Sequence, residues 1–181
     1  MAPPKVLGDN SNLGNEFVTI YVGKKRKEYV VHKKVICDAA DYFSKAFTGA
    51  FIEREGIMHL PEETSEAFGL FVDYLYRGTV PSVSSQAHLE RLLKLFVFAE
   101  KLCMHELCNE TIDTIRDLCS MYAAAKITSV MVGYLYKNTF TDSPIRTWSL
   151  DDLLFHIDQT NKTGIPKKEH SQTFRKMRTP R

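Results

Sequence analysis

Signals of catalysis and of metal binding are missing from this chain of 181 residues. Its four cysteines form no Cys-x-x-Cys pair and its six histidines form no His-x-x-x-His pair, which are spacings that bring two metal ligands together. Its nine glycines form neither a Gly-x-Gly-x-x-Gly fingerprint nor a phosphate-binding loop, and no serine stands in a nucleophile elbow. We therefore predict no catalytic residue, no metal site and no cofactor.

Long apolar runs are also missing. No run approaches the length of about 18 residues that a membrane-spanning helix needs, and residues 1–5 lack the apolar stretch of a secretory signal. The expected location is therefore intracellular, in the nucleus or the cytoplasm, without a membrane partner. Thiols stay reduced in that setting, so Cys37, Cys103, Cys108 and Cys119, all in predicted helices, are expected to pack as small core residues.

Charges of both signs are present but unevenly distributed. The net charge is +2, yet residues 162–181 carry seven Lys or Arg against one Glu, so the other 161 residues sum to −4. A basic end containing Ser, Thr, Pro and Gln on a mildly acidic body is typical of a disordered tail. Residues 1–14 are rich in Pro, Gly and Asn and poor in apolar groups, so we expect a flexible amino terminus.

The spacing of apolar residues switches between two and 3.6 within residues 17–80, which predicts a mixed unit of strands and helices. A hydrophobic content of 44% is enough for a sizeable core. The predicted elements are strands over 17–22, 28–31 and 57–60, a charged turn over 23–27, one continuous helix from Val35 to Phe47, and a helix over 65–77 that Gly78 ends in the left-handed conformation.

Further helices are predicted beyond residue 80. One over 89–103 is apolar on most sides and is expected to be central, whereas one over 104–119 has a single apolar face. A weaker pattern predicts a helix around 127–135, and Ser149 is predicted to be the N-cap of a last helix. The helix over 104–119 is expected to turn Cys108, Ile112, Ile115 and Cys119 inward and Glu106, Glu110, Asp113 and Asp117 outward.

The residues that fill this order resemble the BTB/POZ domain family. The resemblance rests on His32-Lys33 after the hairpin, Tyr42-Phe43 late in the first helix, Leu60-Pro61-Glu62 at the end of the third strand, and the spaced residues from Phe68 to Gly78. The segments 136–139 and 143–146 are similar to the region that follows the domain in short fungal BTB proteins. Asn15-Glu16 depart from the pattern, because many members place an Asp just before the first strand.

The resemblance implies an α+β BTB/POZ fold over residues 15–120, with a small mixed sheet flanked by a cluster of helices. A helical extension over 121–161 and a basic disordered tail over 162–181 would follow. The implied function is a non-enzymatic protein-protein interaction module that forms a homodimer.

A cullin is the most specific partner that the resemblance implies. In BTB adaptors of cullin-RING ubiquitin ligases, a hydrophobic-x-Glu motif just after the Tyr-Phe helix helps to bind the cullin amino-terminal domain. Phe51-Ile52-Glu53 stands at that place, so Phe51 and Glu53 are the candidate cullin contacts. An aromatic anchor beside a carboxylate is also a sensible interface hot spot. In the alternative interpretation, Phe51 only folds back onto Phe47 and the edge of the sheet.

Self-association in this family uses the region of the first helix. Asp38, Asp41, Tyr42 and Lys45 are left over once the core face of that helix is assigned, so they are the candidate self-association surface.

The basic run Lys24, Lys25, Arg26 and Lys27 has two interpretations. It matches a nuclear localisation signal or an anion-binding patch, but its place in a two-strand turn also suits side chains that keep a hairpin soluble. A nuclear DNA-associated factor, dimerised by its BTB domain, is the alternative function that would use this run. Nucleic acid is not the expected partner, because no predicted helix projects a face of Arg, Asn or Gln.

His32 stands at a strand-to-helix junction. A histidine there is suited to act as a general base or to bind nearby backbone groups. We expect the structural role, because no other catalytic signal accompanies it.

Overall fold

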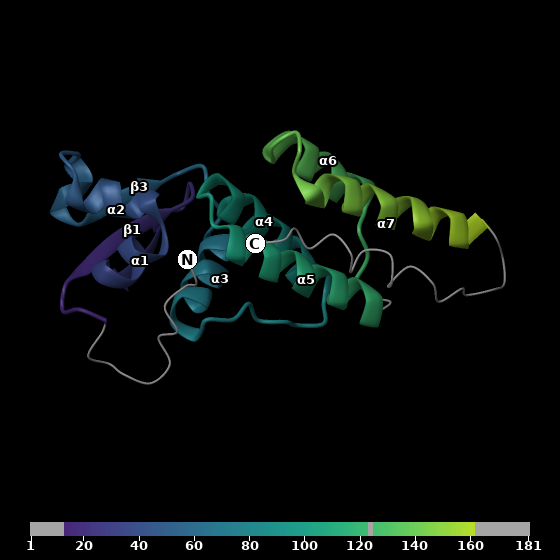
Figure 1. Cartoon of the computed structure of the whole chain (residues 1–181), viewed down its shortest axis with the longest axis horizontal. Helices are drawn as coiled ribbons and strands as arrows, with labels where there is room; N and C mark the ends of the chain where they lie inside the picture. Colours follow the sequence, from purple (N-terminus) through teal and green to yellow (C-terminus); the bar gives the residue numbers. More distant parts are fainter. Residues whose placement is uncertain (1–12, 123–124, 162–181) are drawn as a thin grey trace, which may run out of the picture.

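The structure of the protein is a computed structural model, which describes residues 13–122 and 125–161 (Figure 1). The sheet lies toward one end with α1 and α2, the helices α3, α4 and α5 lie near the centre, and α7 extends toward the other end (Figure 1). In chain order the elements are β1 (Phe17–Val22), β2 (Lys27–His32), α1 (Lys33–Ala39), α2 (Asp41–Thr48), the 3-10 helix η2 (Ile52–Glu55), β3 (Ile57–Leu60), α3 (Ser65–Arg77), α4 (Gln86–Lys101), α5 (His105–Met121), α6 (Ser129–Asn138) and α7 (Pro144–Asn161).

The sheet is small and mixed, as predicted. Its order is β2-β1-β3, with β1 antiparallel to β2 and parallel to β3. Side chains alternate between the two faces of a strand, and Val18, Ile20 and Val22 of β1 are at most 1% exposed. One face of the sheet therefore belongs to the core, and the residues between these three point to the other face.

The helix predicted from Val35 to Phe47 is broken, so that prediction is wrong. Ala40 is extended, with φ −150° and ψ 133°, and it separates α1 from α2. Its carbonyl accepts hydrogen bonds from the backbone N–H groups of Phe43 and Ser44, each at 3.1 Å, which starts the second helix. The bend lets Ile36 of α1 and Phe43 of α2 both reach 0% exposure.

Phenylalanine rings join α2, α3 and α4. The ring centroid of Phe71 lies 5.9 Å from that of Phe43, 5.6 Å from that of Phe68 and 5.3 Å from that of Phe98. All four rings are at most 3% exposed. The helix α4 also packs against α5 and α6, so its predicted central place is confirmed.

Cys103 corrects the prediction that all four cysteines pack inside helices. It is exposed and lies in the turn after α4, with φ +56°. Cys103 N–H donates to the carbonyl of Glu100 at 3.0 Å and Met104 N–H donates to that of Ala99 at 2.9 Å. These two bonds form a Schellman C-cap with a cysteine at the left-handed position that glycine usually takes, so no glycine marked the end of the helix.

The other three cysteines are partly buried. All four thiols are free. Burial raises the pKa of Cys108 and of Cys119 to about 12, with smaller contributions from nearby acidic groups, Glu100 first for Cys108 and Asp152 for Cys119. These two thiols stay protonated near neutral pH and are poor nucleophiles.

Glu110 of α5 was predicted to point to solvent, and that prediction is wrong. Its side chain binds the backbone of the segment before α4. Its Oε1 accepts a hydrogen bond from the backbone N–H of Val80 at 2.5 Å. Val80 is 8% exposed, so its N–H would lack a partner without this carboxylate. The buried positions of α5 are Leu107, Thr111, Ile112, Ile115 and Leu118, whereas Cys108 and Cys119 lie at their margin.

The helical extension is fastened to the body by polar contacts. The Gln86 amide donates to the carbonyl of Lys126 at 2.8 Å and accepts from its N–H at 2.9 Å. Arg146 donates to the carbonyl of Tyr136 at 2.7 Å and to the hydroxyl of Thr139 at 2.9 Å. Within the extension, Arg146 thereby joins residues 136–139 to residues 143–146.

Ser149 is not the N-cap of the last helix. The helix α7 begins at Pro144, a residue that suits the first helical position because the missing N–H costs nothing there. Ser149 is buried within α7, and its hydroxyl donates to the carbonyl of Arg146 at 3.0 Å.

The chain ends fall largely outside the described residues. This holds for the predicted flexible amino terminus, except residues 13 and 14, and for the basic tail over 162–181. The predicted domain boundaries therefore stay predictions.

We predict that Glu110→Ala lowers the free energy of unfolding by about 1 to 3 kcal/mol, because it leaves a buried backbone N–H without its acceptor. Asp117→Ala, at an exposed acidic position on the same helix, is the matched control and should change stability by about 0.5 kcal/mol or less. Urea unfolding of both variants measures the difference. Equal effects would contradict the role of Glu110.

Candidate protein-interaction surface

The segment between α2 and β3 exposes two large apolar side chains. Phe51 is 63% exposed and Ile52 is 80% exposed. Gly49 ends α2 by donating its N–H to the carbonyl of Lys45 at 2.9 Å, and a Cβ at this position would collide with that carbonyl oxygen. Gly56, with φ +86°, ends η2 and leads into β3. Both ends of the segment are therefore fixed by glycines.

Phe51 lies outside the core, whereas Phe47 in the last turn of α2 is 0% exposed. The Cδ2 atom of the Phe51 ring lies 3.3 Å from the place where a Cβ of Gly49 would be. The ring thus rests beside the backbone turn and presents most of its area to solvent. The cullin contact itself stays a prediction.

The half-buried Glu53 and the exposed Tyr42 adjoin this region. Burial raises the pKa of the Tyr42 hydroxyl, and the carboxylates of Glu53 and then Glu63 add to the shift, which places both acids near that side chain. Tyr42 is nevertheless 49% exposed. Glu63 is neutralised by an ion pair with Lys101 at 2.9 Å. We call Tyr42, Phe51, Ile52 and Glu53 the η2 surface.

The four residues predicted for self-association do not share one helix. Asp38 lies on α1 and forms an ion pair with Lys34 at 2.7 Å, whereas Asp41, Tyr42 and Lys45 lie on α2 beyond the break at Ala40. Asp41, Tyr42 and Lys45 are exposed. Tyr42 connects this group to the η2 surface. Self-association through these residues stays a prediction.

The basic turn is divided between two faces of the sheet. Lys24, Lys25, Arg26 and Lys27 are all exposed. The guanidinium of Arg26 lies 5.3 Å from the ring centroid of Tyr21, and the ammonium of Lys27 lies 5.0 Å from that of Tyr29. Tyr29 packs edge-on against the buried Phe68, so it belongs to the core side of the sheet, whereas Tyr21 points to the outer face.

His32 has a structural role, but its side-chain partner is not a backbone group as expected. The Nδ1 atom lies 2.8 Å from the hydroxyl of Tyr76, and the His32 backbone N–H donates to the same hydroxyl at 3.0 Å. The ring also lies 4.5 Å from that of Phe17, between centroids. These contacts fasten the end of β2 to α3.

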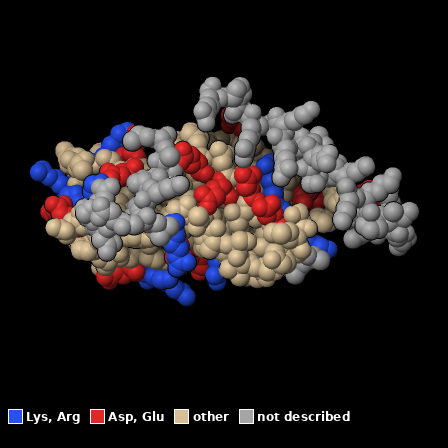
Figure 2. Space-filling view, turned by 60° about the horizontal axis from the view of Figure 1, so that its bottom comes forward, with Lys and Arg blue, Asp and Glu red and all other residues tan. Residues whose placement is uncertain are grey.

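The surface carries more than one charged region. Figure 2 shows acidic side chains gathered near the middle of the face that it draws. Among the described residues, no cluster of three or more His, Cys, Asp or Glu side chains has the geometry to hold a metal ion.

None of the helices in the same part of the chain combines the length and apolarity needed to cross a membrane.

Sequence reasoning missed two residues that the structure makes prominent, Ile52 and His59, and one connection, that of Tyr42 to the η2 surface. Ile52 is the most exposed member of the η2 surface. Tyr42 was predicted for self-association, but its connection to the η2 surface follows only from the unpredicted bend at Ala40, which places it at the start of α2. His59 stacks on Tyr21 at 5.1 Å between ring centroids. A period of two marks His59 as outward, but only the pairing of β1 with β3 shows its neighbour.

Comparison with known proteins agrees with this architecture. The BTB/POZ domain family matches residues 13–119, more than half of the chain. The Xenopus laevis protein named Inhibitor of Bruton tyrosine kinase is 29% identical over 90 residues, which is 48% of this chain and only 7% of the length of that relative. The BTB domain of zebrafish PATZ1 aligns with a TM-score of 0.43 at 20% identity, covering 55% of this chain and 75% of that one. Because the family match covers more than half of the chain, the protein belongs to the BTB/POZ domain family, whose fold is a non-enzymatic protein-protein interaction module.

Proposed function

We propose that this protein self-associates and is an adaptor that docks on the cullin of a cullin-RING ubiquitin ligase. The observation that carries the docking proposal is the exposure of Phe51 and Ile52 on a segment whose two ends are fixed by glycines. Burying an aromatic or aliphatic side chain of this size in a partner is favourable by about 1.5 to 3 kcal/mol. Residues 52–55 already form the 3-10 helix η2, and the N–H groups of Gly49 and Gly56 are hydrogen-bonded at the two ends, which would reduce the cost of ordering the segment on binding.

The negative charge of Glu53 favours a partner with basic residues. Glu53 stands beside the two apolar side chains, and no Lys or Arg forms an ion pair with it in the part of the chain that the structure describes. A partner with an apolar pocket and a basic rim would therefore fit the η2 surface. The carboxylate would set the orientation and the association rate, while the Phe51 ring would supply most of the affinity.

We also propose that the protein is intracellular and that it is similar to the short fungal BTB proteins. The likeness rests on the segments 136–139 and 143–146. Both segments take part in the contact that Arg146 makes between α6 and α7, which supports a structural reason for their sequence.

The alternative of a DNA-associated factor has less support. Arg26 and Lys27 lie against rings on opposite faces of the sheet, so the basic turn does not present four cations to one phosphate backbone. Binding through exposed lysines would also fall steeply as salt is added, because it depends on counterion release.

We predict that Phe51→Ala weakens binding to a cullin amino-terminal domain by about thirtyfold, equivalent to about 2 kcal/mol, without lowering the melting temperature. Glu53→Lys should weaken it further by reversing the local charge. Isothermal titration calorimetry measures the affinity. Phe140→Ala is the matched control, because Phe140 is 58% exposed and lies beyond α6, and it should bind as the wild type does.

Two outcomes would contradict the docking site. The core variant Phe47→Ala should lower the free energy of unfolding by about 3 to 5 kcal/mol. An equal loss for Phe51→Ala would place the Phe51 ring in the core. Phe51→Ala that is folded and binds as tightly as the wild type would show that the cullin contact lies elsewhere. A wild-type protein that binds no cullin would refute the adaptor function and leave self-association to be tested alone.

We predict a homodimer or larger assembly that depends on the exposed side of α2. Multi-angle light scattering of the wild type should give at least twice the mass of 20.7 kDa. The double variant Asp41→Lys/Tyr42→Ala should shift the mass toward the monomer at the same concentration, because it reverses a charge and removes an exposed ring. Asp117→Lys, on α5, is the control. A wild-type mass that stays monomeric at every concentration would refute self-association.

A further inference from the structure

The outer face of the sheet carries apolar side chains that no other element covers in the described part of the chain. Phe17 and Val30 are each 57% exposed and Ile57 is 50% exposed. They surround Thr19, whose Cα partners in the neighbouring strands are Val30 and Ile57. The solvated face of an antiparallel or mixed sheet is usually polar, so an apolar group of this kind indicates a contact surface.

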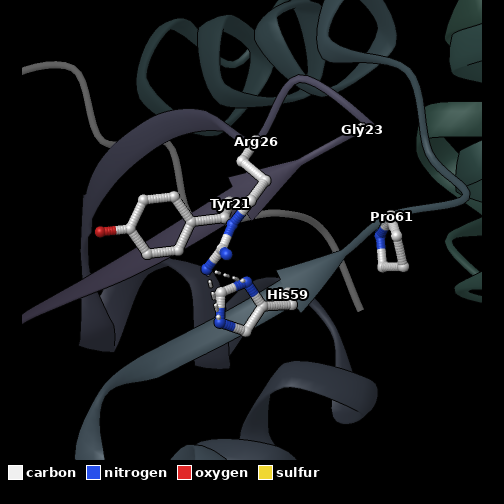
Figure 3. Close-up of a pocket in the computed structure, with 5 residues that line it drawn as sticks. All are labelled: Tyr21, Gly23, Arg26, His59 and Pro61. Carbon is white, nitrogen blue, oxygen red and sulfur yellow. Dashed lines mark hydrogen bonds between the residues drawn. The ribbon is translucent and has the colours of Figure 1, made fainter.

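A small pocket opens at the end of this face. It has a volume of about 290 Å³ and is lined by Tyr21, Gly23, Arg26, His59 and Pro61 (Figure 3). The rings of Tyr21 and His59 are stacked, with an interplanar angle of 16° and 5.1 Å between centroids. Gly23 lines the pocket, and its N–H donates to the carbonyl of Leu60 at 2.9 Å. The volume suits one side chain rather than a whole peptide.

Arg26 supplies the charge of the pocket. The backbone of Arg26 is in the left-handed region, with φ +50°. The guanidinium of Arg26 lies over the ring of Tyr21 and against His59 (Figure 3). The Nη2 atom lies 3.5 Å from both ring nitrogens of His59, which is the limit for a hydrogen bond, so neither nitrogen is a strong acceptor. Within the described residues, no carboxylate forms an ion pair with Arg26.

The charges around the pocket favour an anionic ligand. Lys24 and Lys25 are exposed beside Arg26. Glu28, the Cα partner of Tyr21, is an acidic residue on the same face of the sheet, so one carboxylate stands against the three cations Lys24, Lys25 and Arg26. A guanidinium has five N–H donors in a planar fork that matches a carboxylate or a phosphate, and most of those of Arg26 are not used by strong acceptors.

We propose that the outer face of the sheet binds an extended segment of a partner protein, with an anionic side chain in the pocket at Arg26 and apolar side chains over Thr19. Tyr21 and Phe17 stand four residues apart on β1, or about 13 Å at the rise of a strand. A segment of about five residues spans that distance. The anionic group is a carboxylate or a phosphorylated side chain, which share this chemistry. The surface is separate from the η2 surface, so the proposal does not depend on cullin docking.

The test is fluorescence anisotropy of the full chain with labelled peptides of sequence X-Thr-Leu-Thr-Val and its reverse. X is Asp, phosphoserine or phosphotyrosine, and Asn, Ser or Tyr in the neutral controls. At least one anionic peptide should bind about tenfold or more tightly than its neutral control, because a charge-assisted pair is lost in the control. The three anionic residues distinguish a carboxylate from a phosphate.

Variants locate the binding. Arg26→Ala should weaken the preferred peptide by about tenfold or more, and Val30→Ser should weaken it without removing the preference for the anion. Arg91→Ala, at an exposed arginine on α4, is the matched control and should leave the affinity unchanged. Melting temperatures of all variants show whether they are folded. Replacement of Arg26 by Lys should restore part of the affinity, since Lys keeps the charge but loses the planar fork.

Four results would overturn the proposal. These are no binding by any peptide, equal binding of anionic and neutral peptides, equal losses for Arg26→Ala and Arg91→Ala, and a lower mass of Arg26→Ala in light scattering. The last result would show that a second copy of this chain covers the face.

Discussion

The contact among Phe43, Phe68, Phe71 and Phe98 determines where the exposed surfaces lie. These rings hold α2, α3 and α4 together, and all are nearly inaccessible to solvent. Once Phe43 and Phe47 point inward, the opposite side of α2 must present Asp41, Tyr42 and Lys45 to solvent. The end of α2 is fixed by the same contact. The chain that leaves it at Gly49 therefore carries Phe51 and Ile52 out of the core rather than into it.

The sheet obeys the same constraint from its other side. Val18, Ile20 and Val22 are buried, so strand alternation sends Phe17, Thr19 and Tyr21 outward. Placing Phe17 inside would require a register shift that moves all three buried residues into water. The exposure of apolar groups on the outer face is thus a consequence of the register and cannot be relieved by a small rearrangement. A binding partner can cover them.

Local patterns predicted much of the fold. The strands, the helices α3, α4 and α5, and the left-handed Gly78 follow from spacing and capping rules, and Gly78 has φ +70°. The break at Ala40 did not follow, because the apolar spacing continues through two adjacent alanines. Cys103 hid the end of α4 because it takes a left-handed position without being a glycine. The roles of Glu110 and Ser149 depended on partners and boundaries that apolar spacing does not contain.

The candidate surfaces were harder to predict from the sequence, because they too depend on which segments become neighbours in the fold. Phe51 was compatible with both an exposed and a packed position, because that choice depends on how the turn at Gly49 directs the chain. Arg26 and His59 lie 33 positions apart and meet only because β3 pairs with β1 rather than with β2. A period of two gives the face of each strand but not the neighbour of each residue.

The η2 surface and the pocket of the outer face lie at opposite ends of β3. The η2 surface precedes this strand, and the pocket is lined by His59, the residue before the last of β3, and by Pro61, which follows the strand. The strand is held by parallel pairing with β1 and by the bond from the N–H of Thr19 to the carbonyl of Gly56 at 2.8 Å. Coupling between the two sites would require β3 to have two arrangements, whereas all four of its residues are paired with β1 in one register. We therefore expect the two surfaces to bind independently, so that substitutions at Phe51 and at Arg26 report on different partners.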